Sequence, residues 1–179
     1  GWYVVEPSFE EARETYAARR VLEPGMLRDA GKPLQSVIRQ LRAHVAKERK
    51  SIATADAAAR SVLLADFHVC LAECLGNRLL TGMMVDLSAR TTLVSALYQS
   101  TADAQLSNDD HCAIVNALAE GAAAKAEELM LAHIDSLAAR LDQSMAHSGK
   151  SRERLHAALA PCVVGYGEAA SGPGVWMMD

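Results

Sequence analysis

Apolar residues recur along this chain at the three- and four-residue spacing of amphipathic helices. The clearest case runs from Leu34 to Lys50, where Val37, Ile38, Leu41 and Val45 fall on one face. The same periodicity predicts further helices over residues 8–30, 54 or 56 to 75, 78–100, 108–120, 121–145 and, more weakly, 151–160. The pattern therefore predicts an all-α fold, an antiparallel bundle of six to seven helices.

Glycines and polar segments mark where these helices are expected to end. Gly76 and Asn77 form a good C-terminal stop, and Gly121 separates the fifth helix from the sixth. The segment HSGKS is expected to end the sixth helix, and the polar stretch STADAQLSNDD, residues 100–110, to form a loop. Pro24 lies inside the first helix and predicts a kink or restart there.

The two ends of the chain differ from its centre. The opening segment GWYVVEP, residues 1–7, alternates, is aromatic and stops at a proline, so it resembles the end of a strand from a preceding part. Residues 8–148 are expected to form one helical domain. Residues 149–179 are expected to form a short helix followed by a glycine-rich, irregular tail.

Composition supports helix and argues against some functions. The chain has 179 residues, of which 50% are hydrophobic and only 4% aromatic, enough for one core and favourable to helix. Its net charge of -4 argues against direct binding of a phosphate backbone. No apolar run is long enough to span a membrane and no signal segment opens the chain, so we expect a cytoplasmic protein.

The four cysteines form no CxxC pair. Three of them, Cys70, Cys74 and Cys112, lie inside apolar helical patterns, and Cys162 lies near the tail. Reduced, packed thiols are therefore favoured over disulfides or metal ligands.

Three histidines are expected on inward helix faces. In one straight helix His111 and His133 would lie about 33 Å apart, but a hairpin at Gly121 would bring them level, and His68 is flanked by leucines at helical spacing. Imidazoles from three helices can hold a divalent metal such as zinc. Alternatively, each is a buried histidine bonded to a neighbour. The other three, His44, His147 and His156, are expected at the surface.

Two arginines and one asparagine are candidates for binding a small ligand. Arg19 and Arg90 lie beside apolar positions of their helices, an arrangement suited to recognising a carboxylate. Both also have an acidic residue four positions away, Glu23 and Asp86, and simple ion pairs are the alternative. Asn116 follows His111 by five residues and offers an amide, or caps the surface.

Three motifs in this order carry a family resemblance. They are EARETYAARRVLE, with Arg19 and Glu23; FHVCLAECLGN; and the paired-histidine segment DHCAIVNALAEGAAAKAEELMLAH. Together they resemble the FCD domain, the C-terminal effector-binding domain of GntR-type transcriptional regulators of the FadR subfamily. The resemblance covers about residues 3–141, and GWYVVEP is similar to the last strand of the winged helix-turn-helix domain that precedes it in that family.

The resemblance implies a metal-centred pocket for a small organic acid. In the family three histidines and one aspartate hold the metal, and the histidines map to His68, His111 and His133. The aspartate position is Leu64, and Asp66 points about 200° away around the helix. Two outcomes stay open: a three-histidine site completed by water or an effector oxygen, or a metal-free pocket. Zinc is the first candidate metal, with nickel or manganese as others.

The resemblance also implies a function. We expect an effector-sensing and dimerising domain, with no catalytic residue, that controls DNA binding by an N-terminal reader absent from this sequence. Its partners would be a small acid and a second copy of the chain, with DNA contacted only through that reader and no membrane involved. The alternative is a metal-dependent helical-bundle enzyme acting on a small carboxylate. Against it, the sequence lacks the HExxH and ExxH patterns of helical metal enzymes.

Overall fold

The structure is a computed structural model that describes residues 9–29, 31 and 33–163, with side chains described through Ser144. The segment 1–7 and the tail from residue 164, for which we predicted a strand end and an irregular tail, lie outside the described residues. The described residues form six helices: α1 (Phe9–Asp29), α2 (Gln35–Thr54), α3 (Ala57–Leu75), α4 (Arg78–Tyr98), α5 (Thr101–Glu120) and α6 (Ala123–Val163). The predicted all-α fold is confirmed.

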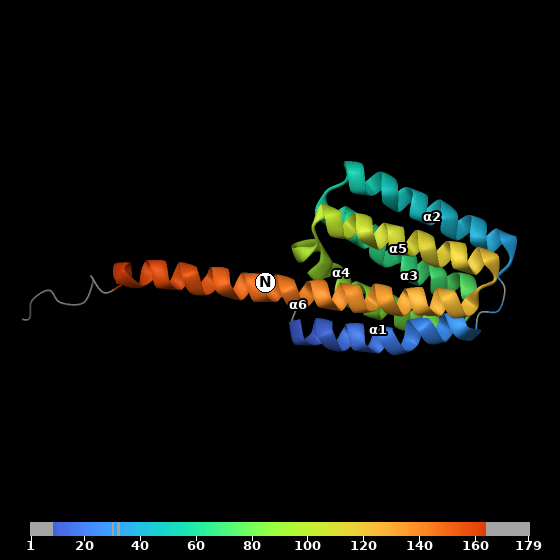
Figure 1. Cartoon of the computed structure of the whole chain (residues 1–179), viewed down its shortest axis with the longest axis horizontal. Helices are drawn as coiled ribbons and strands as arrows, with labels where there is room; N and C mark the ends of the chain where they lie inside the picture. The colour runs from blue at the N-terminus through green and yellow to red at the C-terminus, as the bar shows by residue number, and fades with distance from the viewer. Residues whose placement is uncertain (1–8, 30, 32, 164–179) are drawn as a thin grey trace, which may run out of the picture. The chain divides into compact units, whose positions relative to one another are not determined.

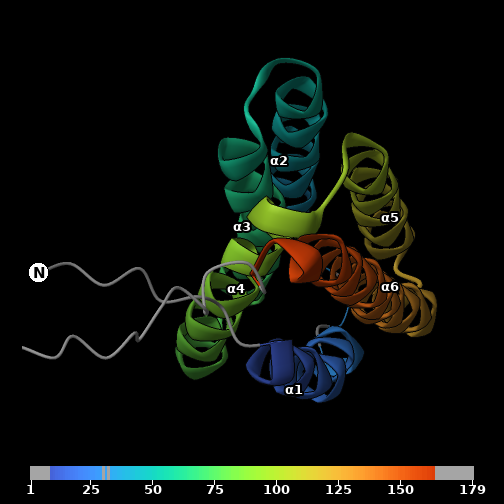
Figure 2. The same cartoon turned by 90° about the vertical axis from the view of Figure 1, so that its left-hand side faces the viewer.

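The described residues divide between two compact units, one ending at Leu141 and the other beginning at Asp142. The first unit contains every residue predicted to form a ligand site. Within it α3 is central, because it packs against α2, α4 and α5. Figures 1 and 2 show α2 beside α5, and α1 beside α4. Phe67, Leu71, Ile114 and Met130 are fully buried where these helices meet.

The helix ends follow the local chemistry that the sequence suggested. Asp56 caps α3 by accepting a hydrogen bond from the amide of Ala59 at 2.8 Å. Gly76 and Gly121 end α3 and α5 with positive φ values of 81° and 75°, which glycine adopts without steric cost. Pro24 lies within a continuous α1, so the helix does not restart there.

Two of the expected breaks are wrong. Residues 101–110 are helix rather than loop, because Ser100 and Asp103 form a capping box that starts α5. Their polarity has another cause, since Ser107 and Asn108 are buried and hydrogen-bonded inside the bundle. HSGKS does not end a helix either, because α6 continues to Val163 and includes the segment predicted as a separate helix over 151–160. A single glycine costs a helix only about 1 kcal/mol.

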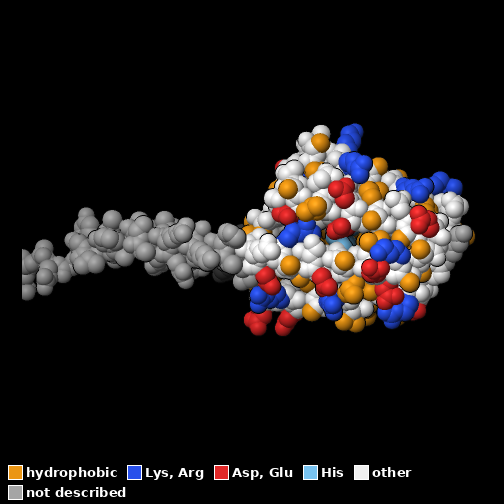
Figure 3. Space-filling view, in the orientation of Figure 1, with side chains coloured by type: hydrophobic (Ala, Val, Ile, Leu, Met, Phe, Trp, Pro, Cys, Tyr) orange, Lys and Arg blue, Asp and Glu red, His pale blue; other side chains and the backbone are white. Residues whose placement is uncertain are grey.

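Charges of both signs are mixed over the face that Figure 3 shows, and no patch of one sign dominates it. Arg20 with Asp135 and Arg28 with Glu127 join α1 to α6 by exposed ion pairs of this kind, each worth little. None of the helices that the structure describes combines the length and apolar character needed to cross a membrane.

Substitution of Gly76 and of Gly82 by alanine tests backbone strain and helix propensity separately. A Cβ at either would meet nothing within 4 Å, so only the backbone decides. Gly76→Ala should lower the free energy of unfolding by about 1–2 kcal/mol, because φ is left-handed there. Gly82→Ala, inside α4, should raise it by up to about 1 kcal/mol. Urea denaturation measures both, and changes of the same sign would contradict the assigned turn.

Candidate functional site

Three histidines from three helices meet in the centre of the first unit. His68 on α3, His111 on α5 and His133 on α6 are all buried, and one ring nitrogen from each lies within 4.8 Å of the others. The Nε2 atoms of His111 and His133 are 3.2 Å apart. The hairpin at Gly121 therefore brings together the two histidines that lie 22 residues apart.

Each of these imidazoles contacts a carboxylate through its other nitrogen. The Nδ1 atom lies 2.5 Å from Glu23 in His68 and 3.0 Å from Glu48 in His111. In His133 it lies 3.0 Å from Asp110. An ionised carboxylate only accepts hydrogen bonds, so each Nδ1 must donate. In a neutral ring the Nε2 lone pair is then left free.

Burial keeps two of the rings neutral. Burial lowers the pKa of His68 to about 3 and the pKa of His133 to about 4, against the opposing pull of their carboxylate partners. For Glu23 burial alone would raise the pKa, but the Arg19 guanidinium and His68 outweigh it and hold the pKa near 2. The carboxylate is therefore ionised and the imidazole donates to it.

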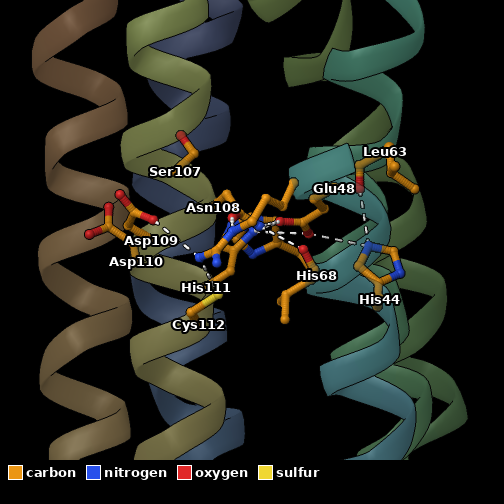
Figure 4. Close-up of polar contacts among 12 residues, drawn as sticks. His44, Glu48, Leu63, His68, Ser107, Asn108, Asp109, Asp110, His111 and Cys112 are labelled. Atoms are coloured by element: carbon orange, nitrogen blue, oxygen red, sulfur yellow. Dashed lines mark hydrogen bonds and ion pairs between the residues drawn. The ribbon is translucent and has the colours of Figure 1, made fainter. Parts of the chain in front are cut away.

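Glu48 is fixed by a network of its own, part of which Figure 4 shows. Asn108 donates to the Glu48 carboxylate at 2.8 Å and to the carbonyl of Val45 at 2.9 Å. His44, predicted at the surface, is in fact buried, 3.3 Å from Glu48 and 3.1 Å from the carbonyl of Leu63. Burial lowers the pKa of His44, but hydrogen bonds to Cys70 and Glu48 outweigh it and raise the pKa to about 10.

Packing fixes the remaining freedom of His111. Phe67 stacks on this ring with centroids 3.9 Å apart and an interplanar angle of 13°. Because Phe67 is itself fully buried, the ring can neither tilt nor flip without disturbing the core. The carboxylate and the phenyl ring together orient its Nε2 atom toward His133.

The donor set fits a transition metal. Tetrahedral zinc with bonds of 2.0–2.1 Å would place two histidine nitrogens about 3.3 Å apart, close to the 3.2 Å between His111 and His133. Without a cation, two lone pairs would face each other at that distance. The widest separation among the three donors is up to 4.8 Å, so a bound ion would draw them closer together. Carboxylates that bond the far nitrogens are the usual supports of histidine ligands.

A cavity lies beside the histidines. Its free space of about 20 Å³ has room for one water-sized molecule, which needs roughly 10–15 Å³ on this measure. Its polar lining consists of the three histidines and of Tyr16, Arg19, Ser61, Thr91, Ser95, Gln99 and Ser107. No Asp or Glu is among the described residues that line it.

Leu64 lines this cavity where the family resemblance led us to look for an aspartate. It is buried, one turn of α3 before His68. Asp66 is exposed, as its position around the helix predicted. The described residues therefore offer no fourth protein ligand in its place, and a fourth ligand would have to be water or an oxygen of a bound molecule.

The structure brings only one of the three predicted effector-binding residues to the cavity. Arg19 is buried and lines it, while Arg90 is exposed, pairs with Asp86 and Glu11, and is not part of the lining. Asn116 is exposed on α5. Side chains of His147, His156 and Cys162 lie outside the described part, and the other three cysteines carry free thiols.

Arg19 forms the ion pair considered from the sequence and also keeps a donor that could bind a ligand. Its Nε donates to Glu23 at 2.6 Å and its Nη1 to the hydroxyl of Thr91 at 3.1 Å. Its Nη2 is buried with no hydrogen-bond partner among the described residues. The ion pair with Glu23 therefore leaves one buried donor for a ligand.

Comparison with known families tests the family resemblance. The family model of the FCD domain matches residues 14–136. The chain belongs to the FCD domain family. FCD domains are the effector-binding regulatory domains of GntR-type regulators, and the three buried histidines lie inside the matched residues. No curated protein matches the chain significantly.

The sequence indicated the histidines of this FCD domain but missed their supports. Glu48 and Asn108 come from helices about 60 residues apart, so no local motif joins them. One signal was present for Glu48: it continues the apolar stripe of Leu41, Val45 and Ile52 on α2 at helical spacing. A charged residue on such a stripe is rarely buried without a partner.

The two arginines should differ sharply in their effect on stability. Arg19→Met should lower the free energy of unfolding by about 3–5 kcal/mol, because it leaves Glu23 buried without its cation. Arg90→Met removes only exposed pairs and should cost under about 1 kcal/mol. Urea denaturation in the presence of a chelator measures both. Equal losses would contradict the buried position of Arg19.

Proposed function

We propose that this FCD domain is the ligand-sensing and dimerisation domain of a GntR-type regulator of the FadR subfamily. It binds a divalent metal through His68, His111 and His133, and a small organic acid beside that metal. Acid binding shifts the domain between two arrangements of its helices and so controls DNA binding by an N-terminal reader. Zinc suits three imidazole ligands best, with nickel or manganese as alternatives.

One observation carries the metal proposal: three buried imidazoles each donate through Nδ1 to a carboxylate. This pattern leaves the Nε2 atoms free, and two of them are 3.2 Å apart. The carboxylates of Glu23, Glu48 and Asp110 orient the rings and make the Nε2 atoms more basic ligands. A purely structural role also needs these carboxylates, but it gives the facing Nε2 lone pairs of His111 and His133 nothing to bind.

The acid proposal rests on the cation, on Leu64 and on Arg19. A divalent ion held by three neutral imidazoles keeps its positive charge and attracts an anionic ligand. Because Leu64 replaces the family's anionic ligand, a coordination position is left for the acid. The free Nη2 of Arg19 in the same cavity suits the second oxygen of a carboxylate.

The dimer proposal draws support from α4. Four of its apolar side chains, Leu79, Met83, Leu93 and Leu97, are exposed. With Asp86 and Arg90 between them they follow the three-and-four spacing of a single helix stripe. Such a row on a helix surface suits contact with a second copy of the chain.

An enzyme that uses the metal to activate water is the competing proposal. It needs a general base near the metal. No carboxylate lines the described cavity, and Glu23, Glu48 and Asp110 are all engaged by the outer nitrogens of the histidines. The geometry therefore favours a sensor.

Two neighbouring aspartates provide a matched test of metal binding. Asp110→Asn should weaken zinc affinity about 10–100-fold, because it removes the carboxylate that supports His133. Asp109 is exposed, lies 3.7 Å from Arg49 and touches no histidine of the site, so Asp109→Asn should bind zinc as the wild type does. Competition titration with a chelating dye measures both affinities. Equal zinc affinity in the two variants would contradict the proposed ligand set.

Small acids should bind beside the bound metal. Lactate and propionate should raise the melting temperature of the zinc-loaded domain and have a much smaller effect after chelation, because the cation holds the carboxylate. Differential scanning fluorimetry measures the shift. Equal shifts with and without zinc would exclude a metal-bound acid, and chelator-sensitive hydrolysis of a supplied substrate would favour the enzyme instead.

A further inference from the structure

Arg60, in the first turn of α3, is a buried cation with no anionic partner among the described residues. It is 7% exposed, and within the described part of the chain it forms no ion pair. Its Nη1 donates to the hydroxyl of Thr101 at 3.3 Å and its Nη2 to the carbonyl of Gln99 at 3.5 Å. Its Nε has no partner. Buried charges are ordinarily paired, as Arg19 is with Glu23.

Arg60 lies on the same face of α3 as the histidine site. Arg60, Leu64 and His68 follow one another at four-residue spacing, so they share one side of the helix. Arg60 and His68 are separated by about 12 Å along the axis. Leu64 and His68 line the cavity. Ser61, which follows Arg60 in sequence, and Gln99, whose carbonyl accepts a hydrogen bond from Arg60, line it too. Arg60 is not itself part of the lining, but it donates to the carbonyl of Gln99, so it lies just outside one end of the cavity, the Arg60 end.

Three of the buried polar atoms that have no partner within the described part belong to residues that line this cavity. Arg19 Nη2 lies at the histidine end, and Ser61 Oγ and Gln99 Oε1 lie at the Arg60 end. The side chains of Leu64 and Leu137 are apolar parts of the wall. A ligand that matched this wall would be polar at both ends and apolar between them.

Two arginines and two aspartates lie near the Arg60 end, and both aspartates are engaged as helix caps. Helices α3 and α5 both begin there, at Ala57 and Thr101, and helix N-termini attract anions. Arg140 is 3.8 Å from Asp103 and has two buried N–H groups without partners. The carboxylates of Asp56 and Asp103 each cap their own helix, and neither forms an ion pair with Arg60 within the described part.

We propose that Arg60 is a second anion-binding site and that the effector is a linear dicarboxylate. This inference rests on the proposed function, because one carboxylate binds at the histidine site beside Arg19. The other binds Arg60, and the methylene chain packs on Leu64. The cavity of about 20 Å³ is too small for such an acid, so binding requires the Gln99 end to open. That movement is a structural change that a regulator could transmit to its DNA reader.

Two acids of equal length test this in the wild type. Glutarate and valerate each have five carbons and differ in one carboxylate. Titration calorimetry on the zinc-loaded domain should give glutarate at least tenfold tighter binding than valerate, with succinate and adipate defining the best length. Equal affinities for glutarate and valerate would overturn the second site.

Substitution of Arg60 assigns the effect to this residue. Arg60→Met should weaken glutarate binding about 10–100-fold, as expected for loss of a charge-assisted hydrogen bond, and leave valerate and zinc affinity unchanged. Arg60→Lys should restore part of the glutarate affinity. Arg28→Met removes an exposed arginine that pairs with Glu127 and does not line the cavity, so it should change neither acid; circular dichroism checks that each variant folds. Unchanged glutarate affinity in Arg60→Met would overturn the inference.

The outcomes also separate this inference from the proposed function. If valerate binds only with zinc but glutarate binds no better, the histidine site stands and the role of Arg60 is wrong. If neither zinc nor either acid binds the wild type, the proposed function fails and this inference fails with it.

Discussion

The site depends on one repeated interaction: a buried imidazole that donates its Nδ1 hydrogen to a buried or half-buried carboxylate. It occurs three times, in Glu23 with His68, Glu48 with His111 and Asp110 with His133. Each pair fixes a tautomer, and the tautomer decides where the free lone pair points. Because the three carboxylates come from α1, α2 and α5, the bundle must be assembled before the lone pairs converge. Metal binding at this site would therefore require the folded bundle.

The fold and the histidines could be predicted because their signals are local. Helical periodicity located α1 to α4, and Gly121, with its positive φ, correctly placed the hairpin that brings His111 level with His133. Local polarity led to wrong predictions where polar side chains form hydrogen bonds inside the core. Residues 100–110 resemble a loop only because Ser107 and Asn108 bond inside the bundle, and His44 seemed exposed although it bonds to Glu48.

The partners of the histidines could not be found this way, since pairing across helices leaves no spacing in the sequence. Glu23 and His68 are 45 residues apart, and Glu48 and His111 are 63 apart. The arginines show the same limit: Arg19 and Arg90 have similar local patterns, yet only Arg19 lies at the cavity. No sequence pattern distinguishes Arg60, because its burial beside neutral partners is visible only in the folded chain. The contacts of the charged residues in the folded structure, more than their spacing in the sequence, support the proposal that this FCD domain senses an anionic ligand.

We propose that His68, His111 and His133 together hold one metal ion. This can be tested by a crystal structure of the zinc-loaded domain, with anomalous difference density recorded at the zinc absorption edge. We expect one strong peak per chain, bound by the Nε2 atoms of all three histidines at about 2.0–2.1 Å, with a non-protein oxygen completing the shell. No peak between these rings, or zinc bound instead at the cysteines, would contradict it.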